Sequence, residues 1–150
     1  MGDFTFEMYE SAVGELSPDD LRFFYYDVAE WSEINQLIEM SNNELLDLAL
    51  NLNIKLIHTI NDIQTINSGE IKFKLYPNET YQTALIRHLR NSFSHFRIIY
   101  KDITYFYMED YNGKECTMLG FVKCDDLHRL IYGIRDYHEK IISNNTMNQF

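Results

Sequence analysis

The sequence contains few of the residues that break regular structure or cross-link a chain. Its 150 residues include six glycines, two prolines and two cysteines. Scarce glycine and proline favour long regular elements. Cys116 and Cys124 are too few for a disulfide framework, and their separation does not suit the close cysteine pairs of zinc sites. We therefore interpret both as reduced thiols.

Long apolar runs are also missing. No stretch approaches the roughly 18 consecutive apolar residues of a membrane span, and the acidic start MGDFTFEMYE lacks the basic and apolar regions of a secretory signal. A hydrophobic fraction of 45% is nevertheless enough for a substantial core. We expect a single cytoplasmic domain over residues 1–150, with residues 143–150 as a loose tail and no membrane contact.

Basic residues are outnumbered by acidic ones, 13 to 23, and the charges are unevenly distributed. Residues 1–70 hold 14 acidic and two basic side chains, whereas residues 71–101 hold six basic side chains and only one acidic residue, Glu79. A globally acidic protein repels polyanions, but a local basic segment can still hold a phosphate group. The charge pattern therefore favours a localised anion site over a surface that coats nucleic acid.

Apolar residues at helical spacing predict three long helices before residue 97. The first follows a start signal at residues 17–20, Ser-Pro-Asp-Asp, and extends to about Met40. The second takes residues 45–63, and the short link between them implies an antiparallel pair. The third begins at Asn78 and runs through Phe96.

Other segments alternate apolar and polar residues. Residues 69–77, GEIKFKLYP, predict a short exposed strand or an extended loop. Residues 102–110 and 114–122 flank an Asn-Gly pair, which predicts a tight hairpin. A final helix begins at Asp125 or Asp126. We therefore expect a mainly α fold, an antiparallel helical bundle with a β-hairpin inserted before its last helix.

The third predicted helix ends in an unusual sequence, RHLRNSFSHF at residues 87–96. Spacings of three and four residues place His88, Asn91 and His95 on one face. Arg90 lies five residues before His95, about 140° away around the helix axis. Two such helices packed about a two-fold axis could bring Arg90 of one chain to His95 of the other, so that a homodimer interface would create the site.

These side-chain types suit the cleavage of RNA by its own 2′-hydroxyl group. Arginine is a permanent cation that fits phosphate oxygens, and histidine titrates near neutral pH and can move a proton. Residues 80–101 contain no Asp or Glu, which argues against a carboxylate-bound magnesium ion, and we expect no metal or other cofactor. The structural alternative is that histidine and arginine near a helix C-terminus stabilise the helix dipole.

The segment LRNSFSHF resembles the signature of the HEPN superfamily, in which an arginine and a polar residue are followed by a histidine after four to six intervening positions. Arg90, Asn91 and His95 match it with four intervening residues. Members of this superfamily are commonly dimeric, metal-independent endoribonucleases of toxin–antitoxin, phage-defence and CRISPR systems. The resemblance therefore implies a HEPN-like domain that cleaves RNA as a homodimer, with Arg90 and His95 as catalytic residues and Asn91 assisting. It also implies an antitoxin or another protein partner.

Two features leave alternatives open. Some HEPN toxins carry a tyrosine two residues after the histidine, which a partner nucleotidyltransferase modifies. This chain has Arg97 there, which argues against control by such a partner.

Arg87, His88 and Arg97 are candidates to bind RNA phosphates, although His88 also suits an orienting or core-edge role. Other HEPN proteins are noncatalytic, so the alternative function is a helical interaction protein that binds a protein partner. The acidic residues 1–70 favour that alternative, and the acid-free helix favours the ribonuclease.

Overall fold

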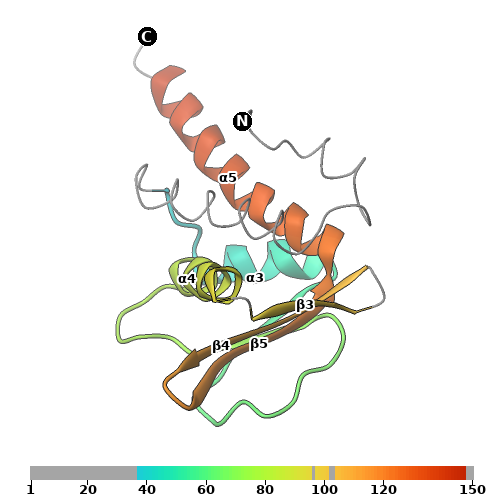
Figure 1. The fold of residues 1–150 in the computed structure, drawn as a ribbon. Coiled ribbons are helices and arrows are strands. Elements are labelled where there is room, and N and C mark those ends of the chain that lie inside the picture. Colours follow the sequence, from blue (N-terminus) through green and yellow to red (C-terminus); the bar gives the residue numbers. More distant parts are fainter. Residues whose placement is uncertain (1–36, 96, 102–103, 148–150) are drawn as a thin grey trace.

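The computed structural model describes residues 37–95, 97–101 and 104–147, and these ranges form helices packed on a five-stranded sheet (Figure 1). The helices are α3 (Asn42–Asn51), α4 (Tyr81–Ser94) and α5 (Cys124–Met147). The strands are β1 (Lys55–His58), β2 (Glu70–Phe73), β3 (Ile98–Lys101), β4 (Tyr105–Asn112) and β5 (Glu115–Lys123).

The fold is α+β, so the expected mainly α bundle is wrong. The strand order is β1-β2-β5-β4-β3, with β1 parallel to β2 and every other neighbouring pair antiparallel. The predicted hairpin is present as β4 and β5, but it forms the centre of a larger sheet rather than an insertion between helices. Its turn is centred on Gly113, whose φ of 63° lies in the left-handed region that glycine adopts readily.

The second predicted helix stops at Asn51, twelve residues before its expected end at residue 63. A capping box between Ser41 and Glu44 starts this helix, α3. Asn53 then adopts a left-handed φ of 64°, which ends the helical geometry. The next residues form β1 instead, because pairing with β2 buries Leu56 between the sheet and α3.

The third predicted helix is shorter at both ends. Asn78 has a φ of 63° and lies in the turn before α4, and Thr80 is the N-cap. At the other end the chain leaves the helix after Ser94 and forms β3, a strand that the sequence pattern did not predict. The β-branched pair Ile98 and Ile99 suits this edge strand, which pairs with β4.

The remaining expectations concern the two ends of the chain. The helix predicted up to Met40 lies outside the described residues except for positions 37–40, which are not helical. Those positions are fixed by hydrogen bonds, from Ile38 N–H to Nδ1 of His138 and from Met40 N–H to Oε1 of Gln82. The last helix begins at Cys124, and it includes residues 143–147 of the segment expected to be loose.

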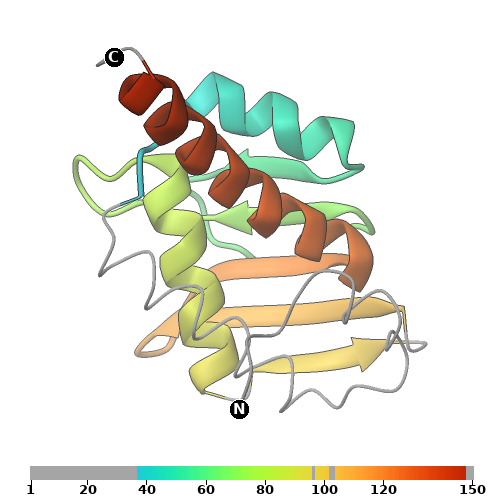
Figure 2. The same ribbon diagram turned by 90° about the horizontal axis from the view of Figure 1, so that it is seen from above.

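The three described helices all cover one face of the sheet, and the core lies between the two layers (Figures 1 and 2). Phe93 of α4 packs edge-to-face on Phe106 of β4, with ring centroids 5.9 Å apart. Gly120 of β5 leaves the space that the Met108 side chain fills, since a Cβ there would lie 2.7 Å from Met108 Cε. None of the described helices is long and apolar enough to cross a bilayer.

Candidate active site

Helix α4 carries most of the predicted site residues because its sequence is strongly two-sided. The Thr80 side chain accepts a hydrogen bond from the Thr83 N–H and fixes the start of the helix. Its apolar residues Leu85, Leu89 and Phe93 are buried in the core. The helix crosses the strands and ends at the β3 edge of the sheet (Figure 2). This crossing places its middle turns above β4 and its last turn at the edge.

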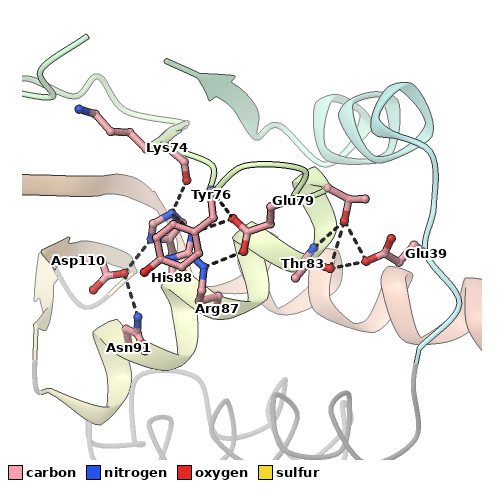
Figure 3. A network of polar contacts seen from close by, with 10 residues as sticks. Glu39, Lys74, Tyr76, Glu79, Thr83, Arg87, His88, Asn91 and Asp110 are labelled. Carbon is pink, nitrogen blue, oxygen red and sulfur yellow. Dashed lines mark hydrogen bonds and ion pairs between the residues drawn. The ribbon is translucent and has the colours of Figure 1, made fainter. Parts of the chain in front are cut away.

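His88 is fully buried, and both of its ring nitrogens face hydrogen-bond acceptors (Figure 3). Nδ1 lies 2.7 Å from Oδ2 of Asp110, and Nε2 lies 2.8 Å from the backbone carbonyl oxygen of Lys74. A neutral imidazole has a single N–H and would satisfy only one of them, so the geometry indicates an imidazolium that donates to both. Nη2 of Arg87 is 3.3 Å from Nε2, but a guanidinium is itself only a donor.

Asp110 supplies the negative charge that faces this imidazolium. Its side chain projects from β4 and is only 3% exposed. Oδ2 accepts from His88 and from Nδ2 of Asn91 at 3.2 Å, and Oδ1 accepts from the Tyr111 N–H at 2.9 Å. An ionised carboxylate offers only acceptors, as these three donors require. His88 and Asp110 therefore form a buried ion pair that joins the hairpin to α4.

The same carboxylate fixes the orientation of Asn91. Because a carboxylate cannot donate, the Nδ2 end of the Asn91 amide must be the end that faces Asp110. The carbonyl end, Oδ1, is then the end available to a donor on the other side of the amide. In the predicted motif, Asn91 therefore offers an acceptor for a neighbouring N–H or hydroxyl group.

Arg87 forms a two-pronged ion pair with Glu79, the acidic residue of the basic segment. Its Nε and Nη2 each donate to a Glu79 oxygen at 2.8 Å, and the two side chains are 15% and 8% exposed. Burial opposes ionisation of Arg87 and Glu79, but their mutual hydrogen bonds and charges raise the pKa of Arg87 and lower the pKa of Glu79. The guanidinium also stacks on the Tyr76 ring, 3.8 Å from its centroid. Arg87 thus anchors the loop between β2 and α4.

The remaining predicted residues lie where α4 gives way to β3. Arg90 is half-buried, and His95 is exposed as the residue that caps the helix. The His95 N–H donates to the Asn91 carbonyl at 2.9 Å, which retains the predicted i, i+4 relation in the backbone. Arg97 is exposed, with its guanidinium carbon 4.8 Å from the centroid of the Tyr111 ring. The structure thus separates the buried His88 and the half-buried Asn91, which both contact Asp110, from the exposed His95 and Arg97.

Asp110 is the residue of this network that sequence reasoning missed. Its signal lay in the alternation of β4, in which Phe106, Met108 and Asp110 share the inward side. A carboxylate on the apolar side of a strand requires a buried partner. The Lys74 carbonyl group had no such signal, because its role depends on how the loop after β2 folds back over α4.

A pocket of about 240 Å³ lies beside the network, between the loop after β2, α4 and the tip of the β4–β5 hairpin. Arg87 and His88 line it together with Lys74 and Glu115, whose side chains form an ion pair at 2.5 Å. Arg87 and His88 have their own partners in Glu79 and Asp110, which do not line the pocket. Within the described ranges, no group of three or more His, Cys, Asp or Glu residues is arranged to hold a metal ion.

Comparison with known protein families gives a match that covers most of the chain. The model of the family described as HEPN pEK499 p136 matches residues 37–145, a range that includes α4, the Arg90–His95 motif and the hairpin that supplies Asp110. No curated protein and no solved structure matches the chain.

Proposed function

Because the chain belongs to the HEPN pEK499 p136 family, we propose that it is an endoribonuclease of the HEPN type that cleaves RNA without a metal ion. The observation that carries the proposal is the position of the motif in the fold. His95 is exposed and Arg90 half-buried at the end of an acid-free helix, and the preceding turn of that helix is held by a buried ion pair. A reactive group on a rigid support is the arrangement that catalysis requires.

In this proposal His95 moves the proton and Arg90 stabilises charge. His95 removes the proton of the RNA 2′-hydroxyl group or returns one to the leaving 5′-oxygen. The 2′-oxygen bonds to phosphorus and the bond from phosphorus to the 5′-oxygen breaks, which yields a 2′,3′-cyclic phosphate and a 5′-hydroxyl. The Arg90 guanidinium stabilises the negative charge that grows on the phosphorane oxygens.

In this scheme Asn91 assists only as a hydrogen-bond acceptor. Its amide nitrogen donates to Asp110, so its carbonyl oxygen is the end that assists catalysis. That oxygen accepts a hydrogen bond from the His95 ring or from a substrate hydroxyl group and so fixes the direction of the proton transfer. His88 does not touch RNA in this scheme, because it is buried between Asp110 and Lys74.

We further propose that the complete site forms in a homodimer. Arg90 lies on α4 and His95 caps its C-terminus five residues later, so one helix does not direct both toward the same phosphate. A two-fold pairing of the α4 ends would supply Arg90 from one protomer and His95 from its partner. Mixing Arg90→Ala with His95→Ala protein tests this directly, because a mixed dimer contains one intact composite site. Activity should return on mixing, and its failure to return in confirmed mixed dimers would exclude the composite site.

The decisive experiment is cleavage of a labelled mixed-sequence RNA in the presence of EDTA. We expect wild type to release products with 2′,3′-cyclic phosphate ends, and Arg90→Ala and His95→Ala to leave the RNA intact. Arg135→Ala is the matched control, since Arg135 forms an exposed ion pair with Glu139 on α5. Intact RNA after incubation with folded wild type would refute the ribonuclease, and the noncatalytic interaction protein would take its place.

A role as a toxin or defence effector has its own test. Expression in a bacterial host should arrest growth, and His95→Ala should relieve the arrest at equal protein level. Normal growth with well-expressed wild type would argue against a toxin. The strongly acidic residues 1–70 would then favour the alternative, in which the surface around α4 binds a protein partner.

A further inference from the structure

The face of the sheet that lies away from the helices carries a group of rings. Along β4, alternate residues are buried under the helices, whereas Tyr105, Tyr107, Glu109 and Tyr111 lie half-buried on the opposite side. Phe121 of β5 pairs with Tyr107, and its ring centroid lies 5.1 Å from that of Tyr105 and 6.4 Å from that of Tyr107. We call Tyr105, Tyr107, Tyr111 and Phe121 the aromatic face.

The sheet register also shows the charges on this side. Four basic residues with described side chains occupy outward positions, against two acidic ones: Lys55, Lys72, Arg97 and Lys123 against Glu70 and Glu109. This excess of positive charge contrasts with the net charge of −10 of the whole chain. The aromatic face itself lies between Arg97, which stacks on Tyr111, and Lys123, which pairs with Tyr105. Its charge therefore suits an anionic partner.

The aromatic face adjoins the end of α4. Arg97 follows His95 by two residues, and its carbonyl group accepts a hydrogen bond from the Glu109 N–H at 2.9 Å. The strand that begins there, β3, continues beside β4, and its outward residue Ile99 is 49% exposed. A chain molecule bound at His95 could therefore continue across β3 and β4 without leaving the protein surface.

The other half of the same side is occupied by the protein itself. Residues 59–69, which connect β1 to β2, pass on the side of the sheet away from the helices (Figure 1, green). Lys72 donates from its outward position to the Thr65 carbonyl at 2.9 Å, and Ile63 is only 6% exposed. Among the described segments, this connection covers the β1–β2 part of the side and leaves β3 and β4 outside its path.

We propose that the aromatic face binds the single-stranded RNA substrate, with bases stacked on its rings and phosphates near Arg97 and Lys123. The proposal rests on the ribonuclease function proposed above and extends it from the reacting phosphate to the flanking nucleotides. Rings on an open sheet face stack with bases of any sequence, and neighbouring cations hold the backbone. A duplex hides its base faces within the stack, so the aromatic face selects single strands.

Glu109 adds a preference within this arrangement. Burial and the Glu109 carboxylate raise the pKa of Tyr107, and the hydrogen bond to Glu109 together with burial raises the pKa of Tyr111 to about 12. Both phenols therefore stay neutral at physiological pH and add no charge that would repel RNA. The carboxylate repels phosphates from the centre of the face and accepts hydrogen bonds from base amino groups. Bases, rather than phosphates, should lie over Tyr107 and Tyr111.

The test measures binding apart from cleavage. In full-length His95→Ala protein, a fluorescein-labelled single-stranded RNA of mixed sequence is titrated and its anisotropy recorded. Tyr107→Ala and Phe121→Ala should each weaken binding about tenfold or more, whereas Tyr107→Phe keeps the ring and should bind normally. Ile57→Ala is the matched control, because Ile57 occupies an outward position on β1. Circular dichroism spectra and unfolding midpoints identify any variant that fails to fold.

The outcomes separate this proposal from the ribonuclease itself. Loss of binding in the two alanine variants alone supports the aromatic face, whether or not wild type cleaves RNA. Normal RNA binding by both folded alanine variants overturns it, even if wild type is an active nuclease. Absence of any RNA binding overturns it as well, and equal affinity for a duplex overturns the single-strand preference. Arg97→Ala should reduce the slope of log affinity against log salt by about 0.7 if Arg97 contacts one phosphate.

Discussion

Removal of the Asp110 carboxylate is the perturbation with the largest expected effect on this fold. Asp110→Ala leaves the His88 imidazolium in a site with no solvent exposure and removes the acceptor of the Asn91 amide and the Tyr111 N–H. Breaking a buried ion pair by removing one partner destabilises proteins by about 3–5 kcal/mol. A single domain is typically stable by about 5–15 kcal/mol. Asp110→Ala should therefore remove a large part of the free energy of unfolding.

The assay is urea unfolding at neutral pH, followed by circular dichroism. Glu139→Ala is the control, since it breaks an exposed pair with Arg135 and should change the free energy by less than about 1 kcal/mol. The double substitution His88→Met with Asp110→Leu removes both charges at similar volume, so it should be more stable than His88→Met alone and Asp110→Leu alone. If Asp110→Ala loses less than about 1 kcal/mol of the free energy of unfolding, the buried ion pair is refuted. It is also refuted if the loss in the double variant equals the sum of the losses in its two single variants.

Three further predictions concern other groups. Burial lowers the pKa of His128 from 6.5 to about 3, so the unfolded chain takes up a proton before the folded one does. The contribution of His128 to the free energy of unfolding should be fully present above pH 6.5 and should fall as the pH drops toward 3, by up to about 1.4 kcal/mol per pH unit. In unfolding curves measured at a series of pH values, His128→Leu should reduce this loss, and an unchanged slope would contradict the assignment. Arg87→Lys should destabilise the fold by about 1–2 kcal/mol, measured by urea unfolding, because lysine cannot make the two-pronged contact with Glu79; an equally stable variant would show that the second prong contributes nothing. Tyr111 should ionise near pH 12 in an ultraviolet titration, and Glu109→Gln should lower that pKa because the negative charge is gone; no difference between the two proteins would exclude Glu109 as the cause.

The parts of the fold that could be predicted are those that depend on neighbouring residues. The hairpin follows from the turn residues before Gly113, and α5 follows from the spacing of Leu127, Leu130 and Ile134, all three of which the core buries. β1 could not be distinguished from a helix, because apolar residues at four-residue spacing, such as Leu52 and Leu56, satisfy either structure. What decides it is pairing with β2, and that pairing depends on residues far away in the sequence.

In the candidate site, too, the features set by neighbouring residues could be predicted, and those set by distant residues could not. Arg90, Asn91 and His95 were identified from their order and spacing, which α4 and its C-cap preserve. The contacts that determine which of the basic residues remain available do not follow from spacing. Asp110 reaches His88 and Asn91 from 22 and 19 residues away, so their contacts with it could not be derived from the helix sequence.

The place of β5 in the sheet has a consequence for how the protein is synthesised. β5 joins the β1–β2 pair to the β3–β4 pair, yet it is the last of the five described strands to leave the ribosome. While residues 115–123 are still inside the exit tunnel, neither pair has its common neighbour, and the Asp110 side chain has no fixed position beneath α4. With the ribonuclease activity proposed above, such a chain would emerge beside its own messenger RNA before the contacts of the motif with β4 are in place. The nascent chain would therefore acquire an ordered site only after residues 115–123 have left the exit tunnel.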